Sequence, residues 1–259
     1  MSEVLGIIDR GVGGLGVYKK IRDVSTRPIV YFADNGSTPY GLVEKNTLKA
    51  RLDYIINFLR QHSATKIILA CNSASVVYPD TNDVKGIVEF GELSLLKAQA
   101  KKPGLIATLG TINSAVYSTR FKQKGMDVIE QVAQTFAIHI ENGLVDGELI
   151  EQEAKQVMST LSSCDAILMA CTHFPAIKDL LQQHVAENCQ LIDPVDELTI
   201  WIEQNWPEKN TAIHTNSKFL VTGSKESFIR SAKISFNVDI EPQNVFIVDD
   251  EFLTITAQQ

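Results

Sequence analysis

Short apolar runs alternate with amphipathic stretches along the whole chain. The runs at 4–8, 66–70 and 166–170 consist almost entirely of apolar residues, as expected of strands that are buried on both faces. The stretch 47–61 instead repeats its apolar positions at helical spacing, with Leu48, Leu52, Ile55, Ile56 and Leu59 on one face. Strands that alternate with helices in this way predict an α/β fold with mostly parallel sheets.

The same reading predicts ten strands and seven helices. The strands are expected at 4–8, 28–32, 66–70, 87–89, 104–107, 127–131, 166–170, 191–194, 218–221 and 245–248. The helices are expected at 17–22, 47–61, 93–100, 113–124, 148–161, 195–206 and 225–232. The pattern restarts near Pro103, which indicates two α/β halves.

Each half carries a cysteine directly after a predicted strand. Cys71 follows the run 66–70, and Cys171 follows the run 166–170. The two cysteines are 100 residues apart (171 − 71 = 100). Ligands of open α/β sheets bind outside the carboxyl ends of the strands. Two similar halves related by a pseudo-twofold axis place the two thiols across one shared cleft, a common position for a small-molecule site.

Composition and charge narrow the class of protein. The chain has 259 residues, of which 44% are hydrophobic and 21% charged, with a net charge of −7 and scattered lysines. This composition argues against a nucleic-acid-binding surface. No run approaches the length of a membrane span and no signal peptide is recognisable, so we expect a cytoplasmic protein with no membrane partner. The four cysteines are widely spaced, which favours free thiols over disulfides or a zinc site.

Neighbouring residues give the two thiols a possible chemistry. Asp9 ends the first strand and His173 lies two positions after Cys171, so either could move a proton to or from sulfur. A lone buried cysteine is more often a small apolar residue, and a cysteine hydrolase needs only one nucleophile. A matched pair suits a reaction in which one thiolate removes a proton from a carbon and the opposite thiol returns one. The loop Gly11-Val12-Gly13-Gly14 lacks the register of a dinucleotide-binding motif.

Several motifs together resemble glutamate racemases, within the cofactor-independent aspartate/glutamate racemase superfamily. They are Asp9-Arg10-Gly11-Val12-Gly13-Gly14-Leu15, Asp34 with Pro39-Tyr40-Gly41, Ala70-Cys71-Asn72-Ser73-Ala74-Ser75, Gly110-Thr111 and Cys171-Thr172-His173-Phe174-Pro175. The resemblance runs in order over almost the whole chain.

The resemblance implies two flavodoxin-like domains with the active site in the cleft between them. Their expected bounds are 1–93 plus 208–259 for the first domain and 94–207 for the second. It implies Cys71 and Cys171 as catalytic acid/bases, assisted by Asp9 and His173. Substrate amino and carboxylate groups would be held by Asn72, Ser73, Thr111 and Thr172, and the side-chain end would be lined by Pro39, Tyr40 and Gly41. It implies no metal and no cofactor.

The function implied is racemisation of L-glutamate to D-glutamate for peptidoglycan synthesis. The resemblance also suggests a homodimer. Two alternatives stay open: a racemase of aspartate or another amino acid, and a non-catalytic homologue that binds an acidic ligand.

Arg10 and the segment Asn35-Gly36-Ser37 depart from the family pattern. The family usually has serine where this chain has Arg10, and a small hydroxyl residue, alanine and a basic residue where this chain has Asn35-Gly36-Ser37. Arg10 is expected either to point to the surface or pair with an aspartate, or to enter the pocket and bind a carboxylate bidentately. In the second case it would favour a shorter acid such as aspartate.

Overall fold

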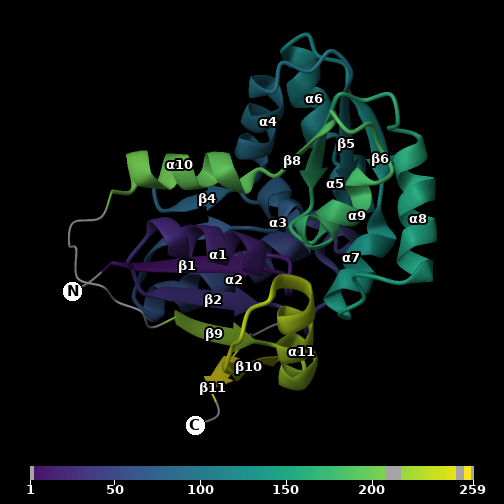
Figure 1. Cartoon of the computed structure of the whole chain (residues 1–259). Coiled ribbons are helices and arrows are strands. Elements are labelled where there is room, and N and C mark those ends of the chain that lie inside the picture. Colours follow the sequence, from purple (N-terminus) through teal and green to yellow (C-terminus); the bar gives the residue numbers. More distant parts are fainter. Residues whose placement is uncertain (1–2, 208–216, 249–253, 258–259) are drawn as a thin grey trace.

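The computed structural model describes residues 3–207, 217–248 and 254–257 and contains two β-sheets flanked by helices (Figure 1). The larger sheet takes its strands from both ends of the chain, in the order β11-β10-β9-β2-β1-β3-β4. Its strands are β1 (Val4–Asp9), β2 (Ile29–Ala33), β3 (Ala64–Leu69), β4 (Val84–Gly86), β9 (Ser217–Val221), β10 (Pro242–Val248) and β11 (Thr254–Ala257). Only β10 and β11 pair antiparallel among these described strands.

The smaller sheet is entirely parallel and has the order β6-β5-β7-β8. Its strands are β5 (Pro103–Ala107), β6 (Ile129–Val132), β7 (Ala166–Ala170) and β8 (Gln190–Ile192). This order repeats β2-β1-β3-β4 of the larger sheet position by position, so β3 and β7 occupy equivalent places. The predicted α/β class with mostly parallel sheets is confirmed.

Helices connect and cover the strands of both sheets (Figure 1). The α-helices are α1 (Leu15–Val24), α2 (Lys45–Gln61), α3 (Asn72–Val77), α4 (Val88–Lys97), α5 (Leu109–Asn113), α6 (Val116–Gln123), α7 (Gln134–Glu141), α8 (Glu148–Ser159), α9 (Lys178–Gln182), α10 (Val195–Asn205) and α11 (Lys225–Phe236). Two 3₁₀ turns, η1 (Tyr40–Leu42) and η2 (Phe174–Ile177), complete the described elements. Across the described residues we find no helix with both the length and the apolar character needed to span a bilayer.

Local sequence explains where the best-defined helices begin and which face they bury. The side chain of Glu44 accepts hydrogen bonds from the backbone N–H groups of Asn46 and Thr47 and so caps α2. The apolar stripe predicted for this helix is buried, while its opposite face is largely exposed. Ser224 caps α11 in the same manner through the N–H of Ser227.

Several predicted elements were wrong. The strand expected at 87–89 lies instead at Val84–Gly86, and Val88 already begins α4. The turn expected at 108–111 is the start of α5, and the helix expected from 113 begins only at Val116, because Ala115 takes a left-handed conformation that ends the preceding turn. Helices α3, α7 and α9 and strand β11 were not predicted.

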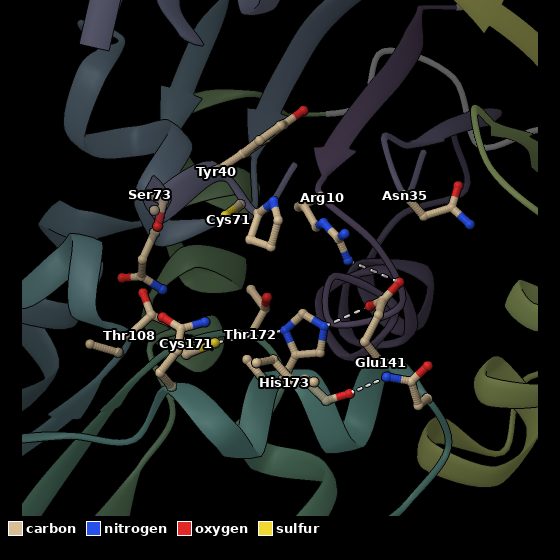
Figure 2. A pocket seen from close by; sticks show the side chains of 18 of the residues that line it. Arg10, Asn35, Tyr40, Cys71, Ser73, Thr108, Glu141, Cys171, Thr172 and His173 are labelled. Carbon is tan, nitrogen blue, oxygen red and sulfur yellow. Dashed lines mark hydrogen bonds and ion pairs between the residues drawn. The ribbon is translucent and has the colours of Figure 1, made fainter. Parts of the chain in front are cut away.

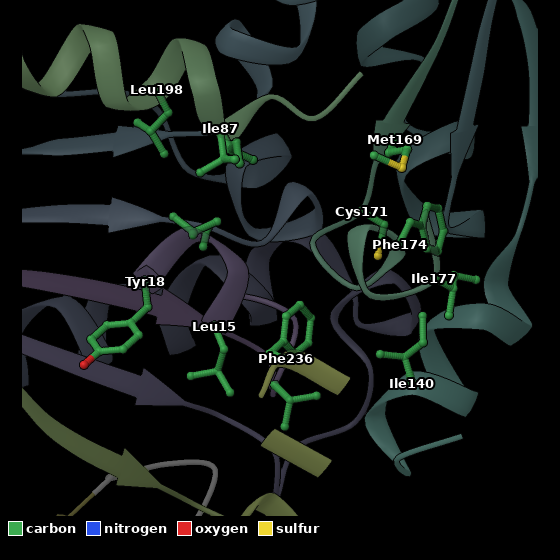
Figure 3. Packing of buried hydrophobic residues seen from close by; sticks show 14 of the residues in the cluster. Leu15, Tyr18, Ile87, Ile140, Met169, Cys171, Phe174, Ile177, Leu198 and Phe236 are labelled. Atoms are coloured by element: carbon green, nitrogen blue, oxygen red, sulfur yellow. The ribbon is translucent and has the colours of Figure 1, made fainter. Parts of the chain in front are cut away.

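One hydrophobic core reaches across both sheets. It joins Leu15 of α1 and Phe236 of α11 to Ile140 of α7 and Phe174 of η2 (Figure 3). The two halves are therefore packed against each other through buried side chains. Within the second half, the rings of Phe136 and Phe174 meet edge to face at 5.9 Å between their centres. The expected domain bounds remain a prediction; one of them falls inside α4 and another at residues 208–216, outside the described residues.

Strand register fixes which residues meet at the carboxyl edge of each sheet. In the larger sheet Ile8 of β1 pairs with Leu69 of β3, so Asp9 and Cys71 leave neighbouring strands at the same edge. In the smaller sheet Ala107 of β5 pairs with Ala170 of β7, so Thr108 and Cys171 do the same. This is the edge at which doubly wound sheets bind their ligands.

Candidate active site

A cavity of about 460 Å³ lies where the carboxyl edges of the two sheets meet (Figure 2). Residues after β1, β2 and β3 line it from one side, and residues after β5 and β7 together with α7 line it from the other. The predicted site residues in its wall are Arg10, Pro39, Tyr40, Gly41, Cys71, Asn72, Ser73, Cys171, Thr172 and His173. Asp9 and Thr111 are buried behind this wall.

Cys71 stands at the N-terminus of α3, with part of its surface open to the cavity. Burial among protein atoms and, secondarily, the nearby Asp9 carboxylate raise the pKa of its thiol well above the usual range. The backbone N–H groups of Ala74 and Ser73 act in the opposite direction without outweighing burial. Cys71 therefore carries a proton near neutral pH and is suited to act as an acid.

Cys171 lies at the equivalent position after β7 and has a histidine partner. Its Sγ atom is 3.7 Å from Nδ1 of His173, and both side chains are buried. Burial alone lowers the pKa of His173, but the hydrogen bonds with Cys171 and Glu141 outweigh it and raise this pKa to about 10. His173 is thus an imidazolium near neutral pH, and its positive charge lies beside the sulfur atom of Cys171.

Glu141, the last residue of α7, completes this side of the site and was not predicted from the sequence. Its Oε2 atom lies 2.8 Å from Nε2 of His173 and also accepts a hydrogen bond of 3.0 Å from the backbone N–H of Val12. The glycine loop lies directly against Glu141 and His173. A Cβ atom added at Gly11 would lie 2.1 Å from Glu141, and one added at Gly13 would lie 2.5 Å from His173. The glycines are therefore needed for close approach.

Asp9 is fully buried and contacts the Cys171 side of the cavity as well as the Cys71 side. Its Oδ2 accepts a hydrogen bond of 3.1 Å from the hydroxyl of Thr172, and its Oδ1 accepts one of 3.0 Å from the N–H of Gly11. Burial raises the pKa of Asp9, although the charge of His173 opposes this. Asp9 thus influences Cys71 by its charge while its hydrogen bonds hold Thr172 and the glycine loop.

Arg10 lines the cavity and pairs with a glutamate, not with an aspartate. Its Nη1 lies 3.6 Å from Oε1 of Glu141, and its Nη2 donates a hydrogen bond of 3.0 Å to the carbonyl of Ser37. Its Nε–H is buried and has no partner among the described residues. The two departures from the family pattern, Arg10 and the segment ending in Ser37, therefore contact each other.

The segment 39–41 is held by a buried carboxylate. Asp34 accepts hydrogen bonds from the hydroxyls of Tyr40 at 2.8 Å and Thr222 at 2.9 Å, and it forms a bidentate pair with Arg51. The Tyr40 hydroxyl consequently points toward Asp34, and burial together with this carboxylate raises its pKa well above the usual value. The tyrosine fixes the wall by position while its hydroxyl is already engaged.

Polar groups beside the thiols remain available for a ligand. The side-chain Oδ1 of Asn72 accepts a 2.7 Å hydrogen bond from the Tyr117 hydroxyl, while its buried Nδ2 has no partner in the described part of the chain. Thr111 reaches the cavity only indirectly, through a 3.2 Å contact with the hydroxyl of Thr108, which does line it. The other lining residues that sequence reasoning missed are Asn35, Gln134, Ala137, Ile138, Asn142, Ala170, Ser224, Ser227 and Phe228.

Metal-ligating side chains do not gather at this cavity. Within the residues that the structure describes, no group of three or more histidine, cysteine, aspartate or glutamate side chains is arranged to hold a metal ion. The charged and titratable groups that line the cavity are arranged around the two thiols, a geometry suited to proton transfer at a small acidic molecule.

Known proteins are similar to this chain in sequence and in fold. A family model described as Asp/Glu/Hydantoin racemase matches residues 14–199. A glutamate racemase of Thermoanaerobacter sp. is 30% identical over 95% of this chain and 97% of its own length. The structure of a Bacillus anthracis glutamate racemase isoform matches 93% of this chain and 96% of its own with a TM-score of 0.82 at 27% identity. That of the Francisella tularensis glutamate racemase, in complex with D-glutamate, matches 96% and 98% with a TM-score of 0.83 at 25% identity. The chain therefore belongs to the Asp/Glu/Hydantoin racemase family.

Proposed function

We propose that this racemase interconverts L-glutamate and D-glutamate without a cofactor, with Cys71 and Cys171 as opposed acid/bases. The observation that carries the proposal is that the two thiols follow topologically equivalent strands and line one cavity. The name shared by its curated relatives, glutamate racemase, supports glutamate as the substrate, as does the D-glutamate complex of the Francisella protein.

The reaction proposed here begins at Cys171, the thiol that has the histidine partner. In this direction Cys171 removes the α-proton, so that the carbon–hydrogen bond breaks and a sulfur–hydrogen bond forms. The thiol of Cys71 then delivers its proton to the opposite face of the same carbon. The pair is left with its protonation states exchanged, which is the state required for the reverse reaction.

Binding groups next to the thiols hold the α-carbon between them. Asn72, Ser73 and Thr172 line the wall, and we assign them to the amino and carboxylate groups of the substrate. The Nδ2 of Asn72, which has no partner among the described residues, is available as a donor to a carboxylate. We assign Thr111 the supporting role of orienting Thr108. The segment Pro39-Tyr40-Gly41 and Arg10 form the part of the wall assigned to the substrate side chain.

A second candidate substrate is aspartate. Arg10 brings a guanidinium into the cavity wall where the family pattern has serine, and its longer side chain can reach a shorter acid. Comparison of Arg10→Ser with the wild type should change the ratio of kcat/KM for aspartate and glutamate. An unchanged ratio would remove Arg10 from the choice between these acids.

The proposed activity also suggests a biological role for the product. We infer that the D-glutamate formed serves peptidoglycan synthesis, in the cytoplasm where that precursor is used. A homodimer remains a prediction whose test is the mass of the protein in solution.

Chiral analysis of single-enantiomer amino acids tests the activity. Purified protein should convert each enantiomer of glutamate, or of aspartate, into its mirror image until both are equal, without added cofactor. A panel that includes alanine and glutamine as neutral controls defines the substrate class. If no acidic amino acid is converted, the protein is a non-catalytic homologue that binds an acidic ligand, and the proposal fails.

A further inference from the structure

Arg10 and His173 share the same carboxylate. Glu141 faces Arg10 with Oε1, at 3.6 Å, and His173 with Oε2, at 2.8 Å (Figure 2). His173 in turn contacts Cys171 at 3.7 Å, so a chain of four side chains leads from Arg10 to the thiol. The three charged members have side chains that are only 21%, 15% and 8% exposed, from Arg10 to His173. Charges at such short distances and low exposure influence one another strongly.

The hold of Arg10 on Glu141 is the weaker of the two contacts. Its separation of 3.6 Å exceeds the length of a normal hydrogen bond, whereas the contact of Glu141 with His173 is within it. The guanidinium has five N–H donors, and its buried Nε–H is without a partner in the described residues. Arg10 can therefore donate hydrogen bonds to another anion while it keeps its hydrogen bond to the carbonyl of Ser37.

The cavity offers an acidic substrate only one fixed positive charge. Of the described residues in its wall, Arg10 alone is permanently cationic, and Glu141 already draws on that charge. A second carboxylate on the substrate would compete with Glu141 for the guanidinium. Glu141 would then act on His173 alone and hold the imidazolium more firmly beside Cys171.

We propose that Arg10 couples recognition of the substrate side-chain carboxylate to activation of Cys171, by exchanging its partner from Glu141 to the substrate. Arg10 is in this sense a positioning residue that acts through Glu141 and His173. The proposal rests on the racemase function proposed above and adds to it: a dicarboxylic amino acid is selected by faster proton removal as well as by binding.

A double-mutant cycle with Arg10→Gln and Glu141→Gln tests the coupling. The rate of α-proton exchange in deuterium oxide is measured for the faster acidic substrate and for glutamine as a neutral one, with kcat and KM determined separately. Because Arg10→Gln leaves Glu141 to act on His173 alone, it should raise KM for the acidic substrate about tenfold, leave its kcat within about twofold, and raise kcat for glutamine exchange about tenfold. In the Glu141→Gln background the same change should raise KM for the acidic substrate but leave kcat unaltered for both substrates. Arg10→Lys, which retains a charge, should keep glutamine exchange closer to the wild-type rate.

A matched control removes an equal charge elsewhere. Arg230→Gln, at an exposed position of α11, should change neither kcat nor KM. The proposal is overturned if Arg10→Gln leaves glutamine exchange unchanged, lowers kcat for both substrates equally, or raises glutamine exchange by the same factor with and without Glu141. Absence of exchange by the wild type with every acidic amino acid would instead reject the racemase function itself.

Discussion

The carboxylate of Glu141 lies 2.8 Å from Nε2 of His173, although the two residues are separated by 32 positions and belong to different elements. The contact joins the end of α7 to the loop after β7 and sets the charge of the histidine that faces Cys171. An acid that fixes a histidine in this way allows it to support a thiolate without moving. Glu141 is therefore as much a part of the proposed machinery as the residues in the cysteine motifs.

Replacing Glu141 with glutamine keeps the shape of the side chain and removes its charge. We expect kcat to fall about a hundredfold, because His173 loses the group that favours its protonated form. Steady-state racemisation measured by circular dichroism would show this loss. The kcat of Glu141→Asp should lie between those of the wild type and Glu141→Gln. Wild-type kcat in Glu141→Gln would exclude Glu141 from proton transfer.

Substitution of Gly13 by alanine tests the close approach of the glycine loop. The added Cβ would lie 2.5 Å from both His173 Nδ1 and Thr172 Oγ1, so the histidine or the loop must shift. We expect a loss of about 1–3 kcal/mol in the free energy of unfolding and a larger proportional loss in kcat.

Gly16→Ala is the matched control for Gly13→Ala. Its Cβ would meet only the Phe236 ring at 3.4 Å, an ordinary contact, and the position lies inside α1. Urea unfolding should give equal or slightly higher stability for Gly16→Ala. Equal behaviour of the two variants in activity would show that the loop does not position His173.

The charge of His173 should make stability depend on pH in alkaline solution. Its pKa is raised to about 10 in the folded protein, against an ordinary value of 6.5. The resulting stabilisation is fully present below about pH 6.5 and is lost as the pH rises through about 10. Urea unfolding at pH 7 and pH 9.5 should show a greater loss, by about 1–3 kcal/mol, for the wild type than for His173→Gln. Parallel losses in both proteins would contradict the assigned protonation state.

Asp193 should make stability depend on pH in a lower range than His173 does. Burial raises its pKa from 3.8 to about 6, so its contribution to stability is present below about pH 4 and is lost as the pH rises through 6. Asp193→Asn keeps an oxygen for the N–H of Val195, which Asp193 binds at 3.1 Å. Because the carboxyl is only partly shielded from solvent, we expect the variant to be about 1–2 kcal/mol more stable than the wild type at pH 7.5. Thermal unfolding at pH 4 should give nearly equal values.

Sequence reasoning predicted best where one local pattern was sufficient. The buried strands before Cys71 and Cys171 and the amphipathic helix α2 follow from apolar periodicity alone. Helix α7 was missed because only eight residues form it and its buried Phe136 and Ile140 give a weak stripe. Glu141 was missed with it, since its importance arises from tertiary contacts with Val12 and His173 that no local signal reports.

The position of Arg10 shows the same limit. The sequence indicated that Arg10 and the segment 35–37 depart from the family pattern, but it could not show that they touch. The contact between Arg10 and the carbonyl of Ser37 depends on β1 and β2 being adjacent in the sheet. The pairing of Arg10 with Glu141, which joins the two halves of the fold, could not be predicted from the sequence either.

Deuterium incorporation during the first turnovers tests the two-thiol mechanism most directly. A single enantiomer of the acidic substrate is incubated in deuterium oxide, and both enantiomers are separated and analysed by mass spectrometry before equilibrium. If one thiol removes the proton and the other, exchanged with solvent, returns a deuteron, the product carries deuterium at Cα while the remaining substrate does not. Cys71→Ser and Cys171→Ser should each lower racemisation by about a hundredfold or more. Product that retains the original proton, or either variant with normal turnover, would contradict the account.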